Sequence, residues 1–170
     1  MILNSIDIII LTIIITFSLL GFYWGLIRQL ISIVFLIAGI VFASQYNQNI
    51  AGVLLFVVPN TNIVDLVGFV IIVVGVSVIG LLLSSTLHYS IDFIFLSMIS
   101  RMFGSIIGLF QGAIIVTVMI AIFAANPDDQ ISEILRDSQF TIIILKHFKF
   151  VLALMPTTLR QSMEIFFGSL

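Results

Sequence analysis

Two arginines are the residues of this chain best suited to recognise a charged partner. Arg28 and Arg101 each stand at the start of a long apolar segment. A guanidinium can hold a phosphate or a carboxylate through two parallel hydrogen bonds, so either side chain could bind a lipid headgroup or an acidic partner. The simpler alternative, which we favour, is that both only reach from the ends of membrane helices to the headgroup layer.

The third candidate for binding is Gln111, which lies within an apolar stretch and needs a hydrogen-bond partner there. A hydrogen bond between membrane helices is worth about 0.6–2 kcal/mol, which supports packing without requiring a pore. Thr117 projects to a different face of the same helix, so the two do not form a continuous polar track. Gln111 is therefore predicted to serve packing or partner binding.

Catalytic and cofactor chemistry finds little support in the sequence. His88 and Asp92 are four residues apart and could form an acid–base pair, but no nucleophile, metal-ligand set or phosphate loop accompanies them. There is no cysteine, and the two histidines are isolated. With six basic residues and a net charge of −2, the chain shows no basic surface that would bind nucleic acid. We predict no enzyme activity, no metal and no cofactor.

The elements that position these residues must lie in a bilayer. The chain has 170 residues, of which 61% are hydrophobic and only 8% are charged, and its mean hydropathy is +1.34. Soluble domains average about 25% charged residues, so this chain lacks the charge to cover a surface in water. Long continuous apolar runs favour helices over a barrel. The expected fold class is an all-α polytopic membrane protein.

Four spans are expected, over residues 6–24, 27–46, 63–87 and 101–125. Asp7 suits the positive end of the first helix, and Asn4 can cap that helix. The N-terminus lacks the basic region of a cleavable signal, which predicts an uncleaved first span. Phe22, Tyr23 and Trp24 form an aromatic belt between two glycines that permit a sharp reversal.

The fourth span carries the strongest packing signal, because Gly104, Gly108 and Gly112 recur at four-residue spacing. Residues four apart on a helix lie one above the other, so these glycines leave a strip without side chains. Membrane helices associate where small residues let two backbones approach closely. The strip is therefore predicted to dock a helix of the same chain or of another copy. Lesser small positions are predicted on the second and third spans: Gly39, Ala43, Gly80 and Ser84.

Residues 126–170 are predicted to form a membrane-adherent helical tail. Asn126 and Pro127, followed by two acids, are a helix start signal. The apolar stretch 140–155 carries Lys146, His147 and Lys149, and this charge favours an interfacial helix over a fifth span. Thr158 and Gln161 form a capping box for a last amphipathic helix that includes Leu159 and Met163.

The positive-inside rule predicts the orientation. Arg28 and Arg101 fall on the same side of the membrane, whereas Asp7 and Asp65 fall on the other. The side with the arginines is expected to face the cytoplasm, which places both termini outside.

Two stretches resemble segments of the colicin V production protein (CvpA) family. Gly25 to Leu30, with Ser32, is similar to the family pattern R-G-x-x-R-E-x-x-S, and Ser100 to Gly112 is similar to D-R-x-x-G-x-x-x-G-x-x-x-G. The matching residues are Gly25, Arg28, Arg101, Gly104, Gly108 and Gly112. The chain departs from the pattern at Trp24 and Gln29, in place of Arg and an acid, and at Ser100 and Gln111, in place of Asp and a basic residue.

This resemblance implies an integral protein of the bacterial inner membrane that is linked to production or export of a toxin and to envelope maintenance. The predicted role is non-enzymatic, with the lipid bilayer as surroundings and a second copy or another membrane protein as partner. The alternative is a subunit of a membrane channel or small-solute transporter. A membrane enzyme is the third reading, and it lacks a convergent polar site.

Overall fold

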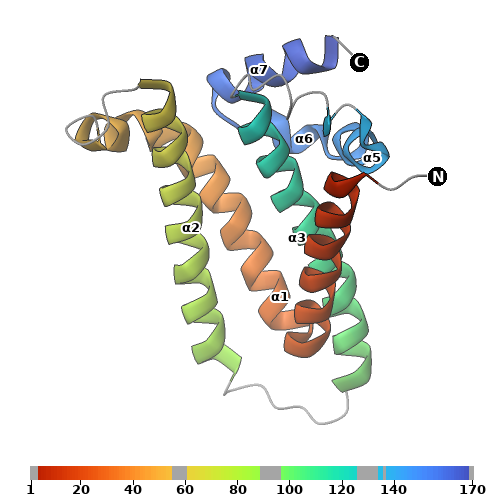
Figure 1. Cartoon of the computed structure of the whole chain (residues 1–170). Helices are drawn as coiled ribbons and strands as arrows, with labels where there is room; N and C mark the ends of the chain where they lie inside the picture. Colours follow the sequence, from red (N-terminus) through yellow and green to blue (C-terminus); the bar gives the residue numbers. More distant parts are fainter. Residues whose placement is uncertain (1–3, 55–60, 89–96, 126–133, 136, 169–170) are drawn as a thin grey trace.

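The computed structural model describes residues 4–54, 61–88, 97–125, 134–135 and 137–168. Within these ranges every regular element is an α-helix (Figure 1), which confirms the expected all-α class. The helices are α1 (Ser5–Leu54), α2 (Thr61–His88), α3 (Ser97–Ala125), α5 (Gln139–His147), α6 (Lys149–Ala153) and α7 (Thr157–Gly168).

Three helices are long and apolar enough to cross a membrane, and their spanning parts are Ser5–Tyr46, Val64–Ser85 and Met98–Ala124. The predicted count of four is not confirmed, because the first two expected spans are the two halves of α1. The apolar part of α1 has 42 residues, and a helix of that length measures about 63 Å at 1.5 Å per residue. This is about twice the hydrocarbon thickness of a bilayer, so four crossings stay a prediction.

A break at Gly25 divides α1 into two antiparallel halves (Figure 1). Gly25 has φ 77° and ψ 177°, a backbone conformation that residues with a Cβ rarely adopt. The contacts of α3 record the reversal. Gly104 of α3 lies against Gly21, and Gly112 lies against Ile14. The residue numbers on the first half of α1 therefore decrease as those on α3 increase, so these two segments are antiparallel. On the second half of α1 the residue numbers increase along α3 instead, because Ser100 contacts Leu26 and Gln111 contacts Gln29.

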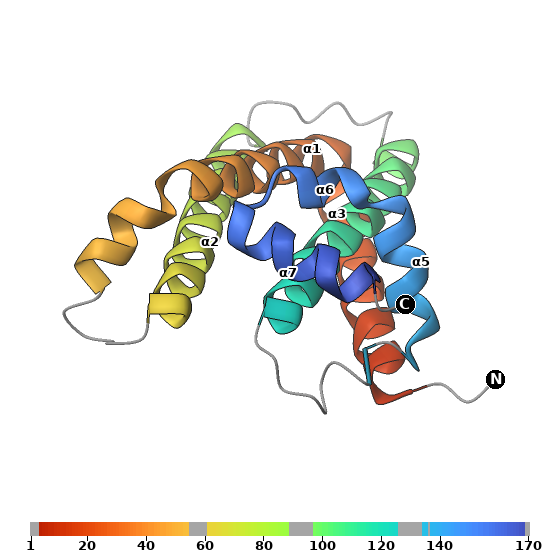
Figure 2. The same cartoon turned by 90° about the horizontal axis from the view of Figure 1, so that it is seen from above.

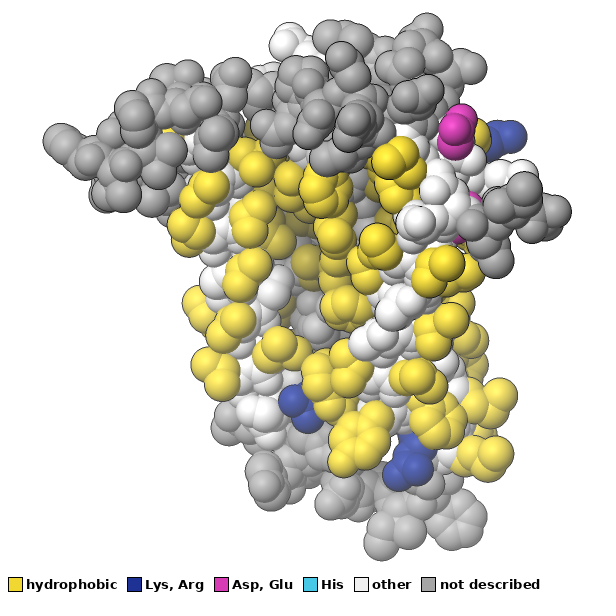
Figure 3. Space-filling model, viewed as in Figure 1, with side chains coloured by type: hydrophobic (Ala, Val, Ile, Leu, Met, Phe, Trp, Pro, Cys, Tyr) yellow, Lys and Arg dark blue, Asp and Glu magenta, His cyan; other side chains and the backbone are white. Residues whose placement is uncertain are grey.

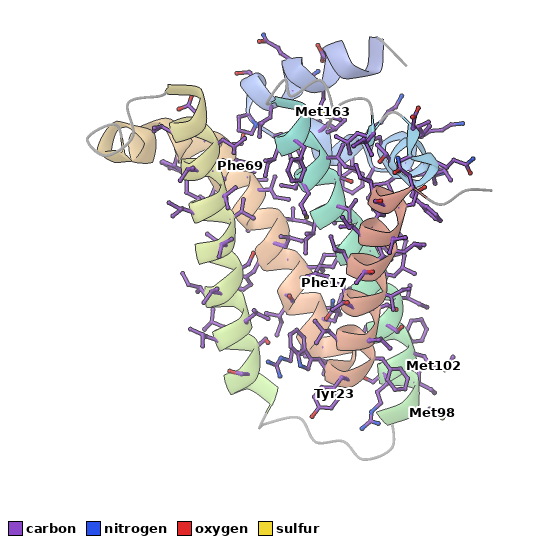
Figure 4. All side chains as sticks on the ribbon, in the orientation of Figure 1. Phe17, Tyr23, Phe69, Met98, Met102 and Met163 are labelled. Carbon is purple, nitrogen blue, oxygen red and sulfur yellow. The ribbon has the colours of Figure 1, made fainter. Side chains whose placement is uncertain are left out.

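The core is organised around α3. Half of its membrane-length window is buried, against 33% of the α1 window and 22% of the α2 window. α1 packs against both α2 and α3, whereas α3 also contacts all three helices of the tail. Most buried apolar residues of α1, α2, α3 and the tail belong to one cluster. Figure 4 shows side chains from these helices filling the space between the ribbons, with Phe69 of α2 and Met163 of α7 labelled.

The tail consists of short helices that lie across the bundle where α3 ends (Figures 1 and 2). They have 9, 5 and 12 residues, so none has the roughly 20 residues that a crossing needs. The predicted helix start at 126–129 lies outside the described residues. α5 and α6 replace the single helix expected over 140–155, because the chain leaves helical geometry at Phe148 (φ −104°, ψ 26°).

Two predicted caps are wrong. α7 begins at Thr157, directly after Pro156, so Thr158 lies inside the helix and is not its N-cap. For α3 the expected cap was Ser97 or Ser100; the helix begins at Ser97, so Ser100 lies inside its first turn and is not its cap. The second half of α1 also continues to Leu54, beyond its predicted end at Tyr46.

Apolar side chains cover the long helices, as Figure 3 shows for one face. Leu19, Leu82 and Met98 are each more than 60% exposed, which suits a surface in contact with acyl chains. The only described basic residues on the long helices are Arg28 and Arg101, which lie near the end opposite the tail. The described part of the molecule therefore has an apolar middle and charged ends.

Candidate functional site at the interface of α1 and α3

The glycine strip of α3 packs against the first half of α1 in the same chain. A Cβ added to Gly108 would overlap the carbonyl oxygen of Phe17 and would lie 2.9 Å from the carbonyl carbon. A Cβ on Gly112 would lie 3.0 Å from the Cα of Ile14. In Figure 4 the labelled Phe17 lies where these two helices run side by side. The strip is therefore filled by backbone of the first half of α1.

The contact is reciprocal at its lower end. A Cβ on Gly104 would overlap the carbonyl oxygen of Gly21, and a Cβ on Gly21 would overlap the carbonyl oxygen of Gly104. Beside this contact, the hydroxyls of Ser18 and Ser105 are hydrogen-bonded at 2.8 Å. Close backbone packing and hydrogen bonds between helices are the forces that hold helices together in lipid, where apolar burial contributes little.

The second set of small residues lies mainly between α1 and α2. A Cβ on Gly39 would be 3.2 Å from the carbonyl oxygen of Val73, and one on Gly80 would overlap the side chain of Phe35. Ala43 is fully buried. Ser84 is 1% exposed and donates to a carbonyl of its own helix. Gly39 and Gly80 are thus the positions at which α2 approaches the second half of α1.

A buried polar cluster joins α3 to the second half of α1. The Nε2 of Gln29 donates to the Oε1 of Gln111 at 2.6 Å, and the Nε2 of Gln111 donates to the Oγ of Ser32 at 2.9 Å. All three side chains are at least 94% buried. Among the described residues the Oε1 of Gln29 has no partner, which costs about 1–3 kcal/mol in an apolar core. We call these three residues the amide cluster.

The turn at Gly25 is capped from α3. The backbone N–H of Leu26, the first residue of the second half, donates to the Oγ of Ser100 at 3.0 Å. Arg28 lies one turn further on, and its guanidinium stacks over the ring of Trp24 at 4.2 Å. Arg101, the other predicted binding residue, is exposed on α3. This end of the bundle thus combines a capped turn with two guanidinium groups.

A polar junction between the start of α1 and the tail was not predicted from the sequence. Asp7 is 3% exposed, and its carboxylate accepts from the Oγ of Ser138 at 2.5 Å and from the N–H of Phe140 at 3.3 Å. Ser138 is also the N-cap of α5. Asn4 donates its side-chain N–H to the carbonyl of Ile134. A serine three residues before Thr141 signals a cap, but no local pattern pairs it with Asp7.

The polar groups of the described spans are thus mostly bonded to each other. In the part of the chain that the structure describes, no group of three or more His, Asp or Glu side chains could hold a metal ion. The contacts described above join α1 to α3 and to the tail. The fold and this interface define an integral membrane protein with a glycine-packed helical core.

Comparison with known families agrees with the two motifs. The model of the family described as colicin V production protein matches residues 6–149 of the chain. The chain belongs to this family. Comparison with curated proteins and with solved structures gives no match. Two of the positions at which the chain departs from the family's charged pattern, Gln29 and Gln111, are hydrogen-bonded to each other.

Proposed function

We propose that this chain is a non-enzymatic protein of the bacterial inner membrane that supports production or export of a colicin V-type toxin and, more broadly, envelope maintenance. The observation that carries the proposal is the family match over residues 6–149. The geometry supports a scaffolding role, because Gln29, Ser32 and Gln111 bond α1 to α3 in the interior. Such a protein acts through the partners that it holds.

Partner contacts are expected away from the glycine strip. That strip is occupied by α1, so a second copy or another membrane protein would have to use a different face of α3. Met98, Met102, Phe103 and Phe110 are exposed on that helix. Photo-cross-linking from Met102 in native membranes would identify the partner, and cross-linking from Ile120, which is 3% exposed on the same helix, serves as the buried control. Equal yields at both sites would contradict this placement.

The proposed function is tested in a toxin-producing strain whose own family member has been deleted. Expression of this chain should restore secreted toxin activity to the level obtained by returning the deleted gene. A variant with a bulky residue in the strip, Gly108→Leu, should fail because it does not accumulate. Normal membrane levels of the wild-type chain without any recovery of toxin would refute the proposal.

The proposed orientation places Arg28 and Arg101 at the cytoplasmic face and both termini outside. Since the chain has no cysteine, single-cysteine variants report accessibility without background. Tyr23 is 80% exposed near the Gly25 turn, and Lys146 is exposed on the tail. A membrane-impermeant thiol reagent applied to intact spheroplasts should label Lys146→Cys and leave Tyr23→Cys unlabelled. The opposite labelling pattern would show that both termini face the cytoplasm.

A channel or small-solute transporter subunit is the second candidate function. The observation in its favour is the amide cluster, in which a buried acceptor, the Oε1 of Gln29, has no partner among the described residues. Polar groups inside membrane proteins often mark pathways for water or solutes. Conductance of the purified protein in planar bilayers, abolished by Gln111→Leu, would favour this candidate over the scaffold.

A further inference from the structure

A pocket of about 520 Å³ lies on the tail, where α6 and α7 meet. Its floor is formed by two apolar side chains, Leu152 and Met163, which are 9% and 1% exposed. Its rim is charged and exposed. The residues that line it are Lys149, Leu152, Ala153, Arg160, Met163 and Glu164. The pocket thus combines an apolar base with two cationic groups and one carboxylate at its edge.

The residues that line the pocket carry a formal net charge of +1, from two basic side chains and one acidic side chain. The Nε of Arg160 is 3.2 Å from the Oε1 of Glu164, and the two side chains are 56% and 66% exposed. An exposed ion pair one helical turn apart contributes little to stability, so the guanidinium can turn to another anion at small cost. A planar guanidinium and an ammonium group together suit a phosphate, which offers several acceptor oxygens.

The position of the pocket favours a lipid as the occupant. Figure 1 shows α5 and α6 lying across the bundle near the level at which α1 begins, with α7 further out. The apolar part of α1 begins at Ser5. The pocket therefore lies where hydrocarbon gives way to headgroups, and a phospholipid presents a phosphate and an apolar chain at that depth.

We propose that this pocket binds an anionic phospholipid, with the phosphate between Lys149 and Arg160 and the base of the acyl chains over Ala153 and the edge of Leu152. Glu164 lowers the affinity, because it competes for Arg160. The site would fix the tail to one leaflet and so hold α6 and α7 over the end of α3. This assignment is independent of the toxin-related function proposed above.

The test measures lipid retention by the full-length protein in a neutral detergent, by native mass spectrometry during titration with phosphatidylglycerol or phosphatidylcholine. The wild-type protein should retain phosphatidylglycerol preferentially. Each basic residue near an anionic headgroup changes affinity roughly five-fold, so Lys149→Gln with Arg160→Gln should weaken retention about thirty-fold. Glu164→Gln should strengthen it about two- to five-fold. Thermal melting of each variant checks that the fold is intact.

Lys146→Gln is the matched control, because Lys146 is an exposed base near the pocket that does not line it. Its retention of phosphatidylglycerol should equal that of the wild type. Unchanged retention in the double variant, or an equal loss in Lys146→Gln, would overturn the proposal by showing that no pocket-specific contact exists. Displacement of the lipid by millimolar inorganic phosphate would overturn the lipid assignment.

Discussion

A single added methyl group at the centre of the glycine strip should separate α1 from α3. In Gly108→Ala the new Cβ would overlap the carbonyl oxygen of Phe17 and lie 2.9 Å from its carbonyl carbon. Ordinary carbon contacts begin at about 3.5 Å, and both neighbours are backbone that cannot rotate away. The two helices must therefore part by several tenths of an ångström along this interface.

The cost follows from overpacking. Extra methylenes in a well-packed core cost about 1–3 kcal/mol, and a gap of about 0.5–1 Å forfeits a quarter to a half of each neighbouring dispersion contact. Gly75→Ala is the matched control, because no atom lies within 4 Å of a Cβ at Gly75. That change should stabilise α2 by about 0.5–1 kcal/mol through helix propensity. The two alanine variants should thus differ by about 1.5–4 kcal/mol.

The assay is reversible unfolding in mixed micelles, followed by circular dichroism as the fraction of denaturing detergent rises. The midpoint of Gly108→Ala should fall and that of Gly75→Ala should rise slightly. Gly108→Leu, which adds more bulk at the same point, should prevent accumulation in membranes. If the two alanine variants unfold within about 0.5 kcal/mol of each other, close packing of the strip does not hold these helices together.

Three further changes address the polar contacts. Asp7→Ala removes the acceptor of a charge-assisted hydrogen bond from the tail and should cost about 1.5–3 kcal/mol; limited proteolysis should then cut the tail faster, and an unchanged rate would contradict the junction. Gln29→Leu and Gln111→Leu should show a coupling energy of about 0.6–2 kcal/mol in a double-mutant cycle, whereas additive effects would deny that they interact. Ser100→Ala should cost about 0.5–2 kcal/mol by exposing the N–H of Leu26, and Ser100→Asp should retain the wild-type midpoint.

Local patterns in the sequence predicted the helices and the turn, because these depend on neighbouring residues. The membrane-length helices α2 and α3 begin and end within a few residues of the predicted spans. Of the two glycines expected to permit the reversal, Gly25 supplies it, with a positive φ. Gly21 stays helical, and its missing side chain admits the backbone of Gly104 instead. Periodicity identifies small residues but does not tell a turn from a contact.

Contacts between distant residues could not be predicted from the sequence. Ser100 was one of two serines expected to cap α3, yet its hydroxyl accepts from Leu26 in α1. Asp7 was placed at the positive end of a helix, and the structure also bonds it to Ser138 across 131 positions of sequence. Both side chains were expected to act at the start of their own helix, Ser100 as a cap and Asp7 through the helix dipole. Their bonds to other helices depend on the tertiary packing.

The departures from the family's charged pattern are best understood together. A lone carboxylate at position 29 or a lone cation at position 111 would be an uncompensated charge in an apolar core, which costs several kcal/mol. Two glutamines at these positions instead bond to each other at 2.6 Å, so the contact between α1 and α3 is kept without charge. Ser100 likewise offers an oxygen to the N–H of Leu26, as an aspartate there would. The uncharged side chains at these three positions therefore join α1 to α3 by hydrogen bonds.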